Sequence, residues 1–244
     1  MGRCGPLALR RYHPHFSRTG VSAPHNMADR CLLYYITDRS HFGGDESARR
    51  RALIDKVAEA ARVSVDYIQL REKDLSGREL EMLAREVVAV IRESSSSTRI
   101  LINSRVDVAL AAGADGVHLR AGDVLPRDVT GMLSAGARAT QRTGPFIIAA
   151  SCHSNEDVTR AESEGVDFAV FAPVFGKSGA RQASPTGLAA LREACQGKIP
   201  TLALGGVTPG NAASCLDVGA AGVAGIRLFQ ENKIEEVVRT LRAL

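Results

Sequence analysis

The chain has no tryptophan, and aromatic residues make up only 5% of its 244 residues. Beyond residues 1–26 it has no dense patch of lysine and arginine, and its formal net charge is only +4. Proteins that bind nucleic acids use clustered cations, often with stacking aromatic rings. The composition therefore gives no support to a nucleic-acid partner. No apolar run reaches the roughly 20 residues that a membrane-spanning helix needs, so a membrane partner is not expected either.

Cysteines are few, odd in number and without paired spacing. They are Cys4, Cys31, Cys152, Cys195 and Cys215. Structural zinc sites and disulfide frameworks need paired or even-numbered cysteines, so neither is expected. The pattern favours reduced thiols in a cytoplasmic protein. Cys152 has no neighbouring base in the sequence that would make it a nucleophile.

Residues 1–26 contain four arginines and three histidines but no acidic residue. Transit peptides share this composition, but three prolines would interrupt a long amphipathic helix here. We therefore expect residues 1–30 to be a disordered tail, or an extension read from too early a start codon, with Met27 as the true start. Residues 31–244 are predicted to form a single folded domain.

From Cys31 onward, short apolar segments alternate with amphipathic ones. Strands are predicted at Leu32–Thr37, Asp66–Leu70, Arg99–Asn103, Gly116–Leu119, Phe146–Ala150, Phe168–Phe171, Thr201–Leu204 and Gly222–Ile226. Helices are predicted at Glu46–Arg62, Gly77–Glu93, Val106–Ala112, Pro126–Ala135, Asn155–Gly165, Gly187–Ala194, Pro209–Val218 and Ile234–Leu241. Strict alternation requires parallel strands, and eight units predict a closed α/β fold, the (β/α)8 TIM barrel. An open doubly wound sheet is the alternative, but the Gly-x-Gly-x-x-Gly fingerprint is absent after the first strand.

Barrels of this kind carry their chemistry at the carboxyl ends of the strands. At the end of the second predicted strand, alternation places Gln69, Arg71 and Lys73 on one face and Leu70 and Glu72 on the other. Cations at the end of a buried strand need an anionic partner. The partner is either an internal carboxylate or the phosphate of a bound ligand.

A second phosphate site is predicted after the last two strands. Gly205 and Gly206 lead into a helix, and Gly225, Ile226 and Arg227 end the neighbouring strand. Small residues let backbone N–H groups approach an anion, and a helix N-terminus adds a favourable dipole. The alternative is that these glycines only permit tight turns.

Ser151 follows the fifth strand and is predicted to face the Gln69 cluster, with His153 on the same side. Asp123 is a candidate Mg²⁺ ligand beside a phosphate, although an aspartate before a helix is also a common cap. His118 and His153 are interpreted as structural or positioning residues rather than as general bases.

Six motifs stand in a fixed order along residues 33–241. They are Tyr35-Ile36-Thr37-Asp38, Gln69-Leu70-Arg71-Glu72-Lys73, Ile102-Asn103, Ala114-Asp115-Gly116-Val117-His118-Leu119, Ser151-Cys152-His153 and Gly205-Gly206-Val207-Thr208-Pro209. In this order they resemble the motifs of thiamine phosphate synthases and of their TenI-type relatives, the thiazole tautomerases.

The resemblance implies a transferase that joins hydroxymethylpyrimidine diphosphate to thiazole phosphate with loss of diphosphate and with Mg²⁺ as cofactor. It implies that Arg71, Lys73 and Ser151 are catalytic and that Asp123 binds the metal. The substrate-binding residues would be Gln69, Arg71, Lys73, Asn103, Ser151, His153, Lys177, Gly206, Gly225, Ile226 and Arg227.

Two departures from the synthase pattern keep other functions open. Ser104 stands where a second aspartate ligand is usual, and the loop Gly176–Arg181 replaces a threonine-rich loop that ends in lysine. Ser104 is more like the tautomerases, but Pro173 stands where that branch has a histidine. The alternatives are therefore a tautomerase or a non-catalytic regulator that binds thiamine phosphate. The sequence leaves open whether the chain forms a homo-oligomer.

Overall fold

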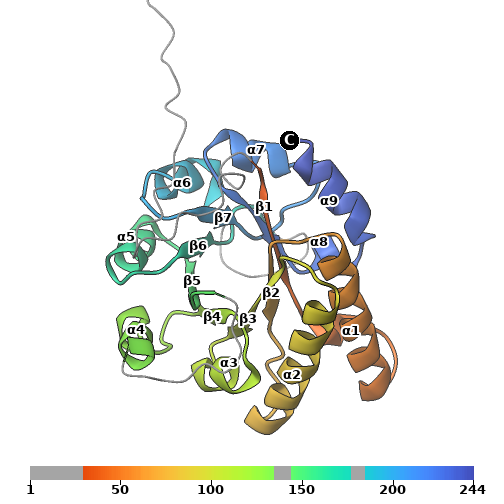
Figure 1. The fold of residues 1–244 in the computed structure, drawn as a ribbon. Helices are drawn as coiled ribbons and strands as arrows, with labels where there is room; N and C mark the ends of the chain where they lie inside the picture. The colour runs from red at the N-terminus through yellow and green to blue at the C-terminus, as the bar shows by residue number, and fades with distance from the viewer. Residues whose placement is uncertain (1–29, 135–143, 177–184) are drawn as a thin grey trace, which may run out of the picture.

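A computed structural model of the chain describes residues 30–134, 144–176 and 185–244. Eight parallel strands form a closed barrel in chain order, with β8 paired to β1 (Figure 1). The strands are β1 (Leu32–Ile36), β2 (Tyr67–Leu70), β3 (Arg99–Asn103), β4 (Gly116–Leu119), β5 (Ile147–Cys152), β6 (Phe168–Phe171), β7 (Thr201–Ala203) and β8 (Gly222–Gly225). The predicted (β/α)8 barrel is confirmed. The predicted tail, apart from Arg30, lies outside the described residues.

Helices surround the barrel (Figure 1). They are α1 (Glu46–Arg62), α2 (Gly77–Glu93), α3 (Val106–Ala112), α4 (Pro126–Ser134), α5 (Asn155–Ser163), α6 (Gly187–Ala194), α7 (Ala212–Asp217), α8 (Arg227–Gln230) and α9 (Ile234–Arg242), with a 3-10 turn η1 (Arg39–His41). The sequence did not predict η1 and α8, because 3 and 4 residues are too short to show a helical period. In the described part of the chain, no helix combines the length and apolarity needed to cross a bilayer.

Three aspartates stand immediately before the even-numbered strands β2, β4 and β6. Each carboxylate accepts a hydrogen bond from the backbone N–H of the second residue of the preceding strand. The pairs are Leu33–Asp66 at 2.8 Å, Ile100–Asp115 at 2.9 Å and Ile148–Asp167 at 2.7 Å. This repeated contact pins the register of the strand pairs at the amino end of the barrel, opposite the predicted site.

Asp66 also joins the two ends of the domain. Its carboxylate, only 2% exposed, accepts hydrogen bonds from Arg30 at 2.5 Å and from Arg242 of α9 at 2.7 Å. A buried carboxylate needs such partners to offset the loss of its hydration. The last helix is therefore held against the first two strands.

The barrel interior changes from apolar to polar along its axis. The ring of Tyr34 packs edge to face against Tyr67 and Phe168, with centroid distances of 5.9 and 5.5 Å. At the next inward positions toward the carboxyl ends of β4 and β5 come His118 and Ser151. The polar half of the interior is thus the half that opens toward the carboxyl ends of the strands, which we call the C-terminal rim.

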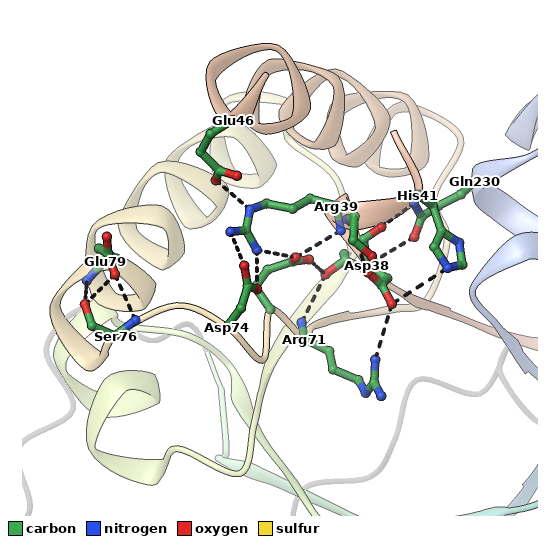
Figure 2. A network of polar contacts seen from close by, with 12 residues as sticks. Asp38, Arg39, His41, Glu46, Arg71, Asp74, Ser76, Glu79 and Gln230 are labelled. Carbon is green, nitrogen blue, oxygen red and sulfur yellow. Dashed lines mark hydrogen bonds and ion pairs between the residues drawn. The ribbon is translucent and has the colours of Figure 1, made fainter. Parts of the chain in front are cut away.

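The loops after β1 and β2 are joined by a network around Arg39 (Figure 2). Its guanidinium, 5% exposed, donates to both carboxylate oxygens of Asp74 at 2.7 Å, to Glu46 at 2.7 Å and to Glu72 at 3.1 Å. Glu72 is 1% exposed and also accepts from the hydroxyl of Thr37 at 2.6 Å. Hydrogen bonding to Asp74 is the main reason that the pKa of Arg39 is raised, and the same contact lowers the pKa of Asp74.

Replacing Arg39 by alanine should lower the free energy of unfolding by about 3–5 kcal/mol, because Glu72 would stay buried without its cation. Urea denaturation measures the loss. Arg50→Ala is the matched control, since Arg50 and Glu86 form a 2.6 Å pair with 35% and 44% of the side chains exposed. An exposed pair of this kind contributes at most about 1 kcal/mol. Equal losses in the two variants would contradict this account of the network.

Candidate active site

The C-terminal rim brings together predicted site residues from separate strands. Gln69 lies in β2, Asn103 ends β3 and Ser151 lies in β5, all with side chains on the inner side of the barrel. Lys177 and the rest of its loop through residue 184 lie outside the described residues. The strand-end positions predicted from the alternation of apolar and polar residues are therefore the ones that meet at the rim.

A chain of four hydrogen-bonded side chains crosses the barrel interior. The amide of Gln69 donates to the hydroxyl of Tyr34 at 3.0 Å, and that hydroxyl lies 3.2 Å from Nδ1 of His118. Nε2 of His118 lies 2.8 Å from Oγ of Ser151. Because the hydroxyl of Tyr34 accepts from the amide, we assign its own proton to the contact with Nδ1. His118 then donates from Nε2 to Ser151.

Burial is the main reason that the pKa of His118 falls to about 3. The imidazole is therefore neutral at ordinary pH and has one proton to place. With Nδ1 accepting from Tyr34, that proton lies on Nε2 and is donated to Ser151. The hydroxyl of Ser151 keeps its own proton available for an acceptor in the mouth of the barrel. In this arrangement His118 holds the hydroxyl of Ser151, and its positioning role stays a prediction.

Of the two cations that alternation predicted at the end of β2, Arg71 lies at the rim and Lys73 lies beyond the strand. Strand β2 ends at Leu70, so Lys73 lies in the following turn with an exposed side chain. Arg71 remains at the rim, 21% exposed, with Nη1 3.8 Å from the carboxylate of Asp38 (Figure 2). Its pKa is lowered, mainly by burial. Arg71 therefore does have an internal carboxylate as partner, one of the two alternatives left open by the sequence. The contact is a long ion pair and not a hydrogen bond.

The sequence did not single out Tyr34 or Gln230 as site residues. Gln230 ends α8, and its side-chain amide brackets Asp38: Oε1 accepts from the backbone N–H at 2.8 Å and Nε2 donates to the carbonyl at 2.9 Å (Figure 2). Tyr34 sits in an apolar run and is typical of a core residue. No local sequence signal marks either, because their partners come from distant segments.

The glycines after β7 are required by close packing. Gly206 has φ +66°, and a Cβ there would lie 2.8 Å from Cβ of Phe175. Asn211 holds the turn, since it donates to the carbonyl of Gly206 at 3.0 Å and accepts from the N–H of Thr208 at 2.8 Å. The tight-turn alternative thus has direct structural support. A phosphate site at this turn stays a prediction, since glycine brings no side chain of its own between its N–H group and an anion.

At the end of β8, Gly225 packs closely against Leu228. A Cβ added to Gly225 would lie 2.8 Å from Cβ of Leu228. Ile226 precedes α8 and Arg227 is its exposed first residue. The predicted turn therefore carries a cation at the rim beside the Gly206 loop.

His153 lies at the outer edge of the rim with an exposed side chain. Its Nδ1 donates to the carbonyl of Ala172 at 2.7 Å, which leaves Nε2 as an unprotonated nitrogen in the neutral ring. Cys152 points away, is 1% exposed, and burial raises its pKa to about 12. A thiol with so high a pKa is not an effective nucleophile, in agreement with the sequence.

The predicted metal ligand Asp123 is engaged by a neighbouring arginine. Its Oδ2 accepts from the backbone N–H of Arg120 at 2.7 Å, and Oδ1 lies 3.3 Å from Nη2 of the same residue. The described residues contain no group of three His, Cys, Asp or Glu side chains that would hold a metal. Mg²⁺ is usually held by one or two carboxylates together with substrate phosphates. As arranged here, the only predicted carboxylate ligand already has a cationic partner, so the residues do not fit Mg²⁺.

Comparison with known proteins gives a consistent picture. The family model described as thiamine monophosphate synthase matches residues 33–229. The thiamine-phosphate synthase of Methanoculleus marisnigri is 36% identical over 215 residues, which cover 86% of this chain and 93% of that protein. The thiamine-phosphate synthase of Chlorobium luteolum is 38% identical over 195 residues, covering 78% and 86%.

Among solved structures, thiamine phosphate pyrophosphorylase from Pyrococcus furiosus matches with a TM-score of 0.70 and 29% identity. The match covers 87% of this chain and 94% of that one. The order of the motifs, the closed barrel and these relatives agree. The chain belongs to the thiamine monophosphate synthase family of transferases.

Proposed function

We propose that the protein joins hydroxymethylpyrimidine diphosphate to thiazole phosphate and releases diphosphate. The carbon–oxygen bond to the diphosphate breaks, and its electron pair leaves with the diphosphate. The lone pair of the thiazole nitrogen then forms the new carbon–nitrogen bond, and no proton is lost. Such a reaction needs positive charge and hydrogen-bond donors at the leaving group, and exclusion of water from the pyrimidine cation.

The observation that carries this proposal is the arrangement of Ser151. Its hydroxyl is held by neutral His118 at 2.8 Å, so that its own proton is free to meet a leaving-group oxygen. Arg71 stands on the same rim with only a 3.8 Å contact to Asp38. A donor of fixed direction and a partly buried cation are suited to stabilising negative charge as it develops.

The remaining roles follow the resemblance and, for the described residues, their position around the rim. Gln69 and Asn103 would contact the pyrimidine, and Lys73 and Lys177 would add charge at the diphosphate. The thiazole phosphate would lie against Gly206 and the turn of Gly225, Ile226 and Arg227. No step of this proposal passes through Mg²⁺, because Asp123 is paired with Arg120.

The first test is an assay for thiamine phosphate and diphosphate with both substrates, with Mg²⁺ and with a chelator. The wild-type protein should form both products in at least one condition. Ser151→Ala should lower kcat by about 10²-fold, the usual effect of losing one preorganised donor. No product from the wild-type protein in either condition would refute the proposed function, and an unchanged kcat in the variant would refute the role of Ser151.

Tyr34→Phe should lower kcat about tenfold with little change in KM, because His118 would lose the contact that sets its tautomer. Tyr35→Phe is a matched control on the opposite face of β1. Its buried hydroxyl has no hydrogen-bond partner among the described residues, so activity should not change. Similar kcat values for the two variants would contradict the positioning role.

The wild-type profile of kcat against pH should show no change due to His118 between about pH 5 and pH 8, since its pKa is about 3.

A second candidate function is tautomerisation of a thiazole phosphate, and one contact favours it. Proton transfer at carbon needs a base. Pro173, which stands at the position of the tautomerase histidine, has no titratable group. His153 donates to the carbonyl of Ala172, the residue before Pro173, and its Nε2 is free to accept a proton. His153 is therefore the candidate base for this reaction.

The two functions predict opposite effects of the same two substitutions on activity. A tautomerase activity carried by His153 should persist in chelator, be lost in His153→Gln and be retained in Ser151→Ala. Synthase activity should be reduced far more by Ser151→Ala than by His153→Gln. Aromatisation of the thiazole, followed by absorbance with no pyrimidine present, measures the first activity. Retention of tautomerase activity in His153→Gln would exclude His153 as its base.

A further inference from the structure

Arg120 is the residue of the rim that neither the motifs nor the proposed reaction has used. It follows β4 directly, and its side chain is 50% exposed. It contacts both positions at which the resemblance led us to look for metal ligands. Nε donates to the hydroxyl of Ser104 at 2.7 Å, and Nη2 lies 3.3 Å from Oδ1 of Asp123.

We propose that the guanidinium of Arg120 takes the place of a divalent cation at this rim, and that Arg120 and Arg71 bind the diphosphate group of the substrate without metal. The identity of the ligand as a diphosphate rests on the proposed function. The binding mode rests on the contacts of these two arginines.

The charges at the rim agree with this replacement. Ser104 is neutral where an aspartate ligand was expected, which removes one negative charge, and Arg120 adds one positive charge. Together the two residues change the local charge by as much as one divalent cation does. Without a cation beside it, Asp123 would repel a diphosphate, so its pairing with Arg120 removes an obstacle to anion binding.

The backbone and side-chain contacts of Ser104 fix the hydroxyl that binds Arg120. Its backbone has φ +63°, a left-handed conformation that non-glycine residues rarely adopt. Its N–H donates to the carbonyl of His118 at 2.8 Å, and its hydroxyl also accepts from the amide of Asn103 at 3.2 Å. The hydroxyl that receives Nε of Arg120 is therefore fixed by the ends of β3 and β4 and does not move freely with the loop.

Both arginines keep donors for a ligand. Nε and Nη2 of Arg120 face Ser104 and Asp123, while Nη1 has no acceptor within residues 30–134, 144–176 and 185–244. In the described part of the chain, the guanidinium of Arg71 has one ion pair, a 3.8 Å contact with Asp38 that is too long for a hydrogen bond. Guanidinium groups bind phosphate oxygens in pairs, and two of them supply enough donors for a diphosphate.

The two cations also act on each other. Burial is the main cause of the lowered pKa of Arg71, and the charge of Arg120 lowers it further. Burial is also the main cause of the lowered pKa of His118; Asp123 raises this pKa, and the charges of Arg71 and Arg120 lower it. An anion bound between them would relieve this repulsion.

Calorimetric titration with inorganic pyrophosphate tests the proposal without turnover. The wild-type protein should bind pyrophosphate in a chelator about as tightly as in Mg²⁺. Arg120→Ala should bind it at least about tenfold more weakly in the chelator, the loss expected for one charge-assisted contact. In Arg120→Ala the freed Asp123 should make binding stronger when Mg²⁺ is added.

Arg105→Ala is the matched control, because Arg105 forms a 2.5 Å pair with Asp107 on the neighbouring loop and should leave binding unchanged. Arg120→Lys should retain part of the affinity, and equal thermal unfolding of all variants confirms that they fold. Pyrophosphate binding that requires Mg²⁺ in the wild-type protein, or that is unchanged in Arg120→Ala, would overturn the proposal.

The outcomes separate this inference from the proposed function. Metal-independent pyrophosphate binding without formation of thiamine phosphate would support the arginine site and refute the synthase. Thiamine phosphate formation that stops in chelator, together with Mg²⁺-dependent pyrophosphate binding, would support the synthase and refute the arginine site.

Discussion

The closed barrel places polar side chains where water cannot reach them, and the site depends on how these groups satisfy one another. Tyr34, Gln69 and His118 are all buried inside the strands. A buried polar group without a partner costs free energy, so each must hydrogen-bond to another inward side chain. The resulting chain ends at Ser151, the member that reaches the mouth of the barrel. The need to satisfy buried polar groups thus produces a hydroxyl with a set direction.

The same requirement divides the arginines at the rim by role. Arg39 is surrounded by Asp74, Glu46 and Glu72, and its donors are taken up in joining two loops. Among the described residues, Arg71 has one ion pair, its long contact with Asp38. Glu72 turns away from the barrel interior to pair with Arg39, so it acts on Arg71 through its charge and not through an ion pair. A carboxylate on the outer side of the strand therefore helps to keep a cation available on the inner side.

Contacts with the scaffold position the cations at the rim. Arg120 is anchored through Ser104, whose backbone is tied to the end of β4. Gln230 clamps the loop that carries Asp38, and Asp38 in turn orients Arg71. Preorganised donors of this kind lose little conformational freedom when an anion arrives, which is what makes them effective in binding and catalysis.

Much of the fold was predictable from local pattern. The strands are short apolar runs and the helices show an apolar face, so their bounds emerge within a few residues of those observed. Gln69, Asn103 and Ser151 were also predictable, because alternation along a strand puts them on the inner side. Lys73 lies three residues beyond the end of β2 at Leu70, so alternation along the strand does not fix the direction of its side chain. Arg120 was placed at the rim but given no role, because an arginine after a strand is typical of a solvated loop.

The sequence by itself determined the alternation of strands and helices, and with it the barrel and the set of residues at its carboxyl rim. Only the tertiary structure decided which group each of these residues meets. Tyr34 and His118 are 84 residues apart, and Asp38 and Gln230 are 192 apart. Contacts over such separations leave no periodic trace in the chain, because they arise from closure of the barrel rather than from neighbouring residues. The tertiary fold brings Arg39 to Glu72, Arg120 to Ser104 and Ser151 to His118.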